Sequence, residues 1–303
     1  MIRLNTIVLL MIWLFLTASS FVVAEQLLPY ANPIASTAIR FALAALLMLL
    51  CVRGKYLSIL SGALALQYFL VSVLLVLFFL GLFVALETTT AVKTSVIYTL
   101  LPLMTVLLNA VVASVRASVF QCLGFVLGSA GALWLLFDLN RKDFANWTWV
   151  SGDGVFLMAC ASLALHVVLL KRWFAGRPPA QSVFTILVFG SFLLLPGFIF
   201  WGESETIQWQ EFGFWWPLLY LTGFTTLGTF FLQQKLLQRL CANDLLATSY
   251  LSPAIVVGLT ASSWFLQGSN GIWGIALTLL GMGLIFQGRP AENPSKSLAK
   301  MRH

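Results

Sequence analysis

The sequence predicts an all-α integral membrane protein in which ten transmembrane helices form two inverted five-helix repeats, with both termini in the cytoplasm. The first observation is composition, because 60% of the 303 residues are hydrophobic and only 9% are charged. Soluble domains carry about 25% charged residues, so lipid must cover most of this surface. The second observation is a series of long apolar runs, and the third is the recurrence of similar signals in the two halves of the chain.

The apolar runs are long enough to be transmembrane helices, which need about 20 residues each. In the first half they cover residues 6–27, 33–52, 67–86, 91–115 and 118–137. In the second half they cover residues 152–170, 181–201, 214–236, 245–265 and 271–287. The first run follows Arg3 and also has features of a cleaved signal peptide, but its length of about 20 residues favours a retained helix.

The distribution of Lys and Arg predicts the orientation. With the N-terminus in the cytoplasm, thirteen of the 17 basic residues fall in segments on the inner side and three in segments on the outer side. This asymmetry is typical of a protein of the bacterial inner membrane that obeys the positive-inside rule. The net charge of +7 is therefore spread over loops, and no basic face for nucleic acid is expected.

Internal similarity predicts the domain organisation. Gly124, Leu127 and Gly131 recur as Gly274, Leu277 and Gly281 at a shift of 150 residues. Because each half has five spans, the second half must enter the membrane in the opposite sense. We expect a first repeat over residues 1–140, a second over residues 149–288 and a basic cytoplasmic tail over residues 289–303.

Several local sequences resemble the drug/metabolite transporter superfamily, specifically its EamA-type members. The resemblance rests on Trp13 with the small residues 17–20, on the segment 37–41, on the Tyr-x-x-x-Pro that ends at Pro102, and on the glycine-rich fifth and tenth runs. It implies two five-helix repeats, cytoplasmic termini and export of small molecules. The second half departs from the first, because Tyr250 lies three rather than four residues before Pro253.

Paired prolines predict where a substrate binds. Pro102 and Pro253 fall inside equivalent spans, and each removes a backbone donor, which frees the carbonyls of Tyr98 and Ser249. Paired broken helices are a sequence indicator of a transporter site, so we expect the site between the fourth and ninth spans. The alternative is that the prolines only kink these helices for packing. The candidate substrate-binding residues in these two spans are Thr94, Tyr98, Pro102, Ser249, Tyr250 and Pro253.

Three further residues are substrate-binding candidates: Trp13, Arg40 and Thr226. Trp13 offers an aromatic face, and Thr226 belongs to a threonine-rich eighth span that either lines the path or packs tightly. The glycines of the fifth and tenth spans predict close packing or a dimer surface, which leaves a homodimer open.

Ionisable residues inside a membrane are functional candidates. Arg40 lies close enough to the outer end of its span to pair with Glu25, and it is alternatively a binding residue for an anion or carboxylate. Glu25 and His166 are the candidate proton carriers, although His166 also fits an interfacial position beside Lys171. Lys93 lies at the outer mouth of the fourth span.

The predicted function is secondary transport, with export of an amino acid or related small polar metabolite by alternating access. No P-loop or metal-binding motif occurs, so we expect no ATP hydrolysis, no cofactor, no metal and no enzymatic activity. The expected partners are a small-molecule substrate and the lipid bilayer. A multidrug or other small-molecule exporter is the main alternative, followed by a membrane-embedded enzyme or a sensor.

Overall fold

The structure is a computed structural model that describes residues 4–52, 62–112, 118–139, 148–260 and 271–288. These residues are mainly helical, with no strand among them. Six helical segments are long and apolar enough to cross a membrane by length and composition, and the apolar helices at 119–134 and 272–287 are shorter. The uninterrupted helices are α1 (Leu4–Leu27), α2 (Pro33–Val52), α3 (Gly62–Leu86), α6 (Val119–Leu139), α7 (Ser151–Phe174), α8 (Pro179–Trp201) and α14 (Gly271–Gln287).

Three further segments change their helical geometry near the middle. The fourth segment consists of α4 (Ala91–Ile97), the 3-10 turn η2 (Tyr98–Leu100) and α5 (Leu101–Val112). The eighth consists of α9 (Phe212–Tyr220), the π-helical segment η4 (Leu221–Gly228) and α10 (Thr229–Leu237). The ninth consists of α11 (Ala242–Ala247), the 3-10 turn η5 (Thr248–Leu251) and α12 (Ser252–Thr260). The breaks predicted at the two prolines are confirmed, whereas the π-helical segment was not predicted.

The carbonyls beside the prolines are not free, which corrects the prediction made from the sequence. The Tyr98 carbonyl accepts a hydrogen bond from the N–H of Leu101, and the Ser249 carbonyl accepts one from the N–H of Ser252. In a 3-10 turn a carbonyl bonds to the N–H three residues later rather than four. Each of these carbonyls therefore has a partner although the proline four residues later has no N–H. These two carbonyls are satisfied within their own turns.

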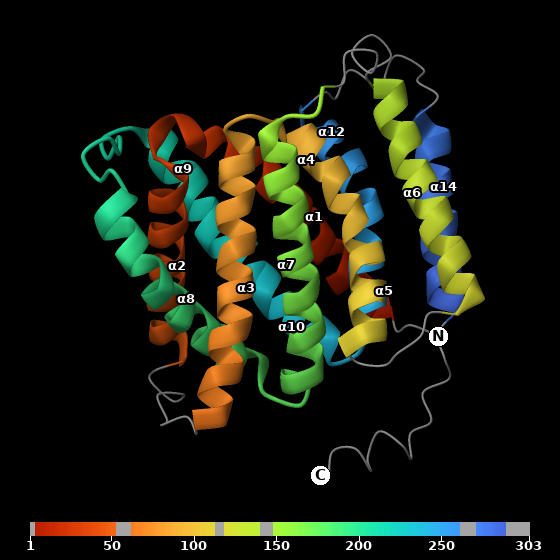
Figure 1. Ribbon diagram of the computed structural model, residues 1–303, viewed down its shortest axis with the longest axis horizontal. Coiled ribbons are helices and arrows are strands. Elements are labelled where there is room, and N and C mark those ends of the chain that lie inside the picture. Colours follow the sequence, from red (N-terminus) through yellow and green to blue (C-terminus); the bar gives the residue numbers. More distant parts are fainter. Residues whose placement is uncertain (1–3, 53–61, 113–117, 140–147, 261–270, 289–303) are drawn as a thin grey trace.

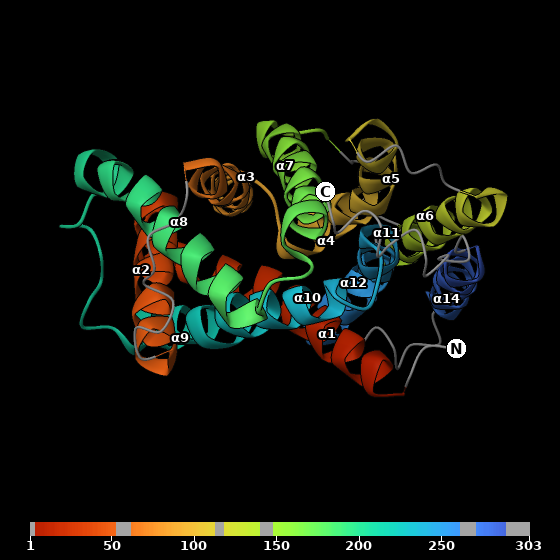
Figure 2. The same ribbon diagram turned by 90° about the horizontal axis from the view of Figure 1, so that it is seen from below.

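The helices lie side by side, with α6 and α14 paired at one end of the molecule and α2, α8 and α9 gathered at the other (Figures 1 and 2). Between these ends, α3 packs against α7. The fourth and ninth segments cross, because α4 contacts α12, α5 contacts α11, and the turns η2 and η5 contact each other. Two segments that were distant in sequence are thereby joined at their breaks.

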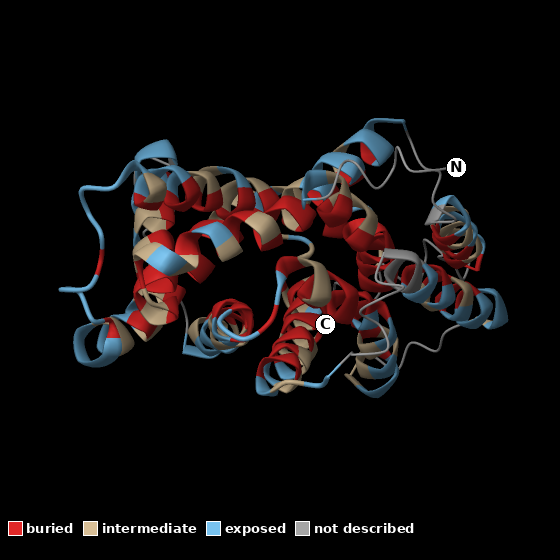
Figure 3. Ribbon diagram, turned by 90° about the horizontal axis from the view of Figure 1, so that it is seen from above, coloured by how far each residue is buried: buried red, intermediate tan, exposed pale blue. Residues whose placement is uncertain are grey.

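Burial follows the pattern expected of a protein in lipid. Buried residues lie between the helices, and exposed residues lie on outward faces (Figure 3). Many outward side chains are large and apolar, among them Leu50, Val111, Val126 and Phe200, all at least 66% exposed. Such a surface is stable in hydrocarbon rather than in water, which agrees with a multi-pass membrane protein.

Glycines allow α6 and α14 to approach closely. A Cβ added to Gly281 would lie 2.5 Å from the backbone nitrogen of Gly128 and 2.6 Å from the carbonyl oxygen of Gly124. A Cβ added to Gly131 would lie 2.6 Å from the carbonyl oxygen of Gly274. Small residues at helix crossings have this role in membrane proteins, so these glycines pack one helix of the chain against another.

A Gly281→Ala variant is expected to lose about 1–2 kcal/mol of unfolding free energy, because the new methyl group meets backbone atoms that move only if the helices separate. Thermal unfolding of the purified protein in detergent measures this loss. Gly283→Ala is the matched control, since no atom lies within 4 Å of a Cβ at that position. Equal unfolding temperatures for the two variants would contradict the close approach.

Candidate solute-binding site

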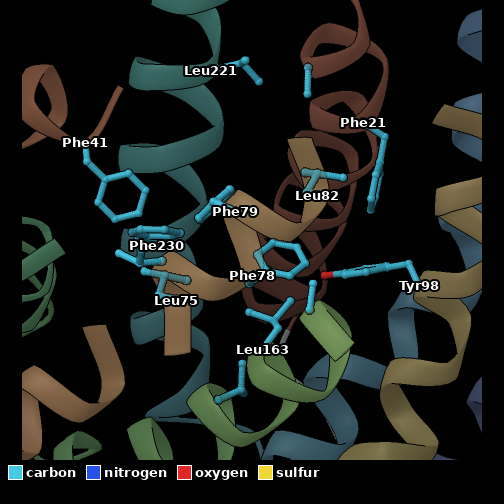
Figure 4. Packing of buried hydrophobic residues seen from close by; sticks show 14 of the residues in the cluster. Phe21, Phe41, Leu75, Phe78, Phe79, Leu82, Tyr98, Leu163, Leu221 and Phe230 are labelled. Carbon is cyan, nitrogen blue, oxygen red and sulfur yellow. The ribbon is translucent and has the colours of Figure 1, made fainter. Parts of the chain in front are cut away.

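A small cavity lies between α1, α3, η2, α7, η4 and α10. Its volume is about 30 Å³, which is room for about two waters. The aromatic residues of its wall are Trp13, Phe21, Phe78, Phe79, Tyr98 and Phe230. They come from α1, α3, η2 and α10. Figure 4 shows Phe21, Phe78 and Phe230 converging with Leu75 and Leu163, and the Tyr98 hydroxyl pointing toward Phe78.

Helical spacing explains why these side chains share one cavity. Trp13, Thr17, Ser20 and Phe21 follow the i, i+4, i+7, i+8 pattern of one helix face, and residues so spaced line up along a helix. The aromatic rings hold each other by edge-to-face contacts. The centroids of Phe21 and Tyr98 are 5.1 Å apart, a separation typical of favourable aromatic pairs.

The polar residues of the wall are Thr17, Ser20, Thr225, Thr229 and Gln233. Thr17 donates to the Trp13 carbonyl at 2.8 Å, and Ser20 donates to the Thr17 carbonyl at 2.6 Å. These hydroxyl protons are bound within their own helix, which leaves the oxygens as acceptors. The indole Nε1 of Trp13 is different, because it is buried and has no hydrogen-bond partner among the described residues.

Arg40 lies fully buried behind this wall. Its Nε donates to the Thr226 hydroxyl at 2.5 Å, and its Nη2 donates to the Thr225 hydroxyl at 2.9 Å. Its guanidinium carbon lies 4.3 Å from the centre of the Phe79 ring, within the range of a cation–π contact. The π-helical segment η4 thus presents two consecutive threonines to one guanidinium.

The predicted pair of Arg40 and Glu25 is wrong. Arg40 is bound by threonines, and the described residues show no ion pair between it and Glu25. The half-buried carboxyl group of Glu25 instead interacts with the backbone N–H of Ala91. The reason is that Arg40 faces η4, so the eighth segment rather than the first supplies its partners.

Four of the predicted substrate-binding residues lie at the cavity. Trp13 and Tyr98 line it, and Thr226 and Arg40 lie directly behind it. Thr94 is buried in α4, where its hydroxyl donates to the carbonyls of Thr90 and Ala91.

The residues of the ninth segment do not line this cavity. The Tyr250 hydroxyl donates to the Phe125 carbonyl at 3.3 Å, and its ring lies against Gly128 of α6. Pro102 and Pro253 are buried in the first turns of α5 and α12. Ser249 is buried, and its hydroxyl has no partner among the described residues. The cavity therefore lies beside the crossing of the fourth and ninth segments, not between them.

His166 is more deeply buried than an interfacial residue, with 2% of its surface exposed. Its Nδ1 donates to the carbonyl of Val71 at 2.7 Å, and this bond joins α7 to α3. The histidine therefore lies inside the helix bundle, which corrects the alternative that placed it at the membrane surface beside Lys171.

Lys93 has a partner that the sequence analysis missed. Its Nζ lies 2.5 Å from Oδ2 of Asp153 and donates to the Thr148 carbonyl at 3.0 Å. The same carboxylate oxygen accepts the N–H of Val150 at 3.0 Å, which caps α7. This ion pair joins the start of α4 in the first half of the chain to the start of α7 in the second.

Some of the other wall residues could be recognised from the sequence as site candidates, and others could not. Gln233 is a polar residue in an apolar run and was therefore detectable. Phe78 and Phe79 belong to α3, which is apolar on every side, so nothing distinguishes the cavity face from the lipid face. Their role follows only from the packing of α3 against the other helices.

Comparison with known proteins agrees with this architecture. Residues 4–137 match the EamA-like transporter family. An uncharacterized transporter of Bacillus subtilis (strain 168), YyaM, is 25% identical over 228 residues, which is 74% of this chain and 74% of YyaM. A solved crystal structure superimposes with a TM-score of 0.72 at 18% identity, covering 96% of this chain and 100% of that one, so the two share a fold. These similarities support the resemblance of this chain to EamA-like transporters of the drug/metabolite transporter superfamily.

Proposed function

We propose that this membrane transporter exports an amino acid or related small polar metabolite by alternating access, through the cavity behind Trp13 and Tyr98. The single observation that carries the proposal is a cavity whose aromatic wall is formed by helices from both halves of the chain and includes Trp13, whose indole N–H has no partner among the described residues. Ligand sites are concave and mostly apolar, with a few polar groups that fix orientation.

Alternating access involves a conformational change. The free space in this structure is small, about 30 Å³, and we propose that the helices around the cavity separate to admit a metabolite. The proposed moving units are the repeats of residues 1–140 and 149–288, related by inverted topology, with residues 289–303 as a cytoplasmic tail. The ion pair of Lys93 and Asp153 joins these two units.

The proposed driving force is a proton gradient or the gradient of the substrate itself. Glu25 and His166 are the proposed proton carriers, because both are ionisable groups within predicted spans. The match of residues 4–137 to a transporter family favours this function over an enzyme. A multidrug exporter is a second candidate, since the wall holds six aromatic side chains and such walls accept varied apolar compounds.

The proposed location is a bacterial inner membrane with both termini in the cytoplasm, which the similarity to a Bacillus transporter and the distribution of basic residues support. A reporter fused after His303 should be cytoplasmic, and one inserted near Glu205 should be outside. The reverse result would overturn the orientation.

The function is tested by metabolite levels inside and outside cells with and without the protein. Wild type should lower one internal metabolite and raise it outside. A Pro102→Ala, Pro253→Ala double variant should do so much less, because it removes the breaks that both crossing segments share. If no compound moves in any condition, the transport proposal fails.

A further inference from the structure

The positive charge of Arg40 has no negative partner in the described part of the chain. Its Nε and Nη2 are bound by neutral hydroxyls, and Nη1 is buried without a hydrogen-bond partner there. Arginine remains protonated under all ordinary conditions in proteins. A buried charge is usually neutralised by an adjacent opposite charge, so the region around Arg40 stays electropositive.

This charge lies one residue layer from the cavity. Thr225 accepts from Arg40 and also lines the cavity, and Phe79 receives the guanidinium near its ring and also lines the cavity. Among the residues that the structure describes, the wall includes no Asp, Glu, Lys or Arg. No charge of the wall therefore offsets the field of Arg40, which acts through a medium of low dielectric constant.

A second observation also indicates a ligand that accepts hydrogen bonds. Trp13 of α1 is a wall residue, and its buried Nε1 has no acceptor among the described residues. Indole nitrogen is only a donor, and a buried donor without a partner costs free energy. An oxygen of a bound solute would satisfy it, whereas an ammonium group would not.

We propose that the cavity takes a monocarboxylate with an apolar body, and that Arg40 determines its preference for an anion over a cation of the same shape. This inference rests on the proposed transport function and specifies the substrate class. The carboxylate accepts from Trp13 in the field of Arg40, and the body lies against Phe21, Phe78 and Phe230. Arg40 acts through Thr225 and Phe79 as a specificity-determining residue.

Binding of three probes that share one body tests the preference. The probes are 3-phenylpropionate, its neutral amide and the cation 3-phenylpropylamine, each added to purified full-length protein in detergent. A ligand that binds the folded state raises the unfolding temperature, so titration gives an apparent Kd for each probe. Wild type should bind the anion about tenfold or more tightly than the cation.

The Arg40→Gln variant should lose most of this ratio, and Arg40→Lys should retain part of it. Arg239→Gln is the matched control, because Arg239 also donates to a threonine, Thr6 at 3.3 Å, but does not line or back the cavity. The preference of Arg239→Gln for the anion over the cation should equal that of wild type. If Arg40→Gln does not fold, Thr225→Val should lower the ratio instead.

Equal binding of anion and cation by wild type would overturn the inference, as would a full ratio in a folded Arg40→Gln. Either result leaves the proposed transport function standing if a metabolite still moves in cells. Absence of any moving metabolite would instead overturn the transport function itself, so the two failures are distinguishable.

Discussion

An Asp153→Ala variant is expected to lose about 3 kcal/mol of unfolding free energy, because it leaves Lys93 largely buried without its carboxylate. The Asp153 side chain is fully buried and that of Lys93 is 16% exposed, so water replaces little of the lost interaction. The variant also loses the bond to the Val150 N–H that caps α7. Thermal and denaturant unfolding in detergent measure the loss.

Two control variants separate the charge from the cap. Asp153→Asn keeps an oxygen for the Val150 N–H and removes only the negative charge, so it should lose less than Asp153→Ala. A Lys93→Met, Asp153→Leu double variant removes both charges and should recover much of the stability, because apolar pairs often replace buried ion pairs at little cost. A double variant no more stable than Asp153→Ala would contradict this account of the pair.

A Thr226→Val variant is expected to lose about 2–3 kcal/mol of unfolding free energy, because it removes the acceptor of a buried guanidinium N–H while keeping the side-chain shape. The same variant should slow transport, since Arg40 would shift relative to Thr225 and Phe79. The unfolding temperature and the rate of metabolite release from cells measure the two effects.

Thr222→Val is the matched control for this variant. Thr222 lies in the same π-helical segment, and its hydroxyl donates to the Leu218 carbonyl at 2.7 Å. The Thr222→Val variant loses one hydrogen bond to the backbone and no contact with a charged group. Its loss of unfolding free energy should therefore be about 1 kcal/mol or less. Similar losses in Thr222→Val and Thr226→Val would show that the bond to Arg40 is not important.

Much of the fold could be predicted from the sequence because lipid imposes a simple rule on helix length and polarity. Each predicted span corresponds to a helical segment within the described residues, and residues 33–52 and 271–287 match their helices at both ends. The breaks near Pro102 and Pro253 were predictable because proline removes a backbone donor. The 3-10 bonds that restore the pairing of the carbonyls were not, since they depend on how each turn tightens.

The candidate site was less predictable, because it depends on which helix faces pack together. The prolines indicated the crossing of the fourth and ninth segments, but the cavity formed beside it, where α1, α3 and α7 approach η4. The partners of Arg40 depend on the π-helical segment, which no residue pattern indicated. Asp153 was missed because it lies at the start of its helix, where an acidic residue is common for capping alone.

The most direct test of the central claim, that solute passes through this cavity, is flux of the identified metabolite into liposomes containing purified protein. Wild type should transport it, and Ser20→Trp should not, because the indole would fill the cavity. Ser162→Trp, on a more exposed part of α7, should transport like wild type. Unchanged flux through a folded Ser20→Trp would contradict the claim.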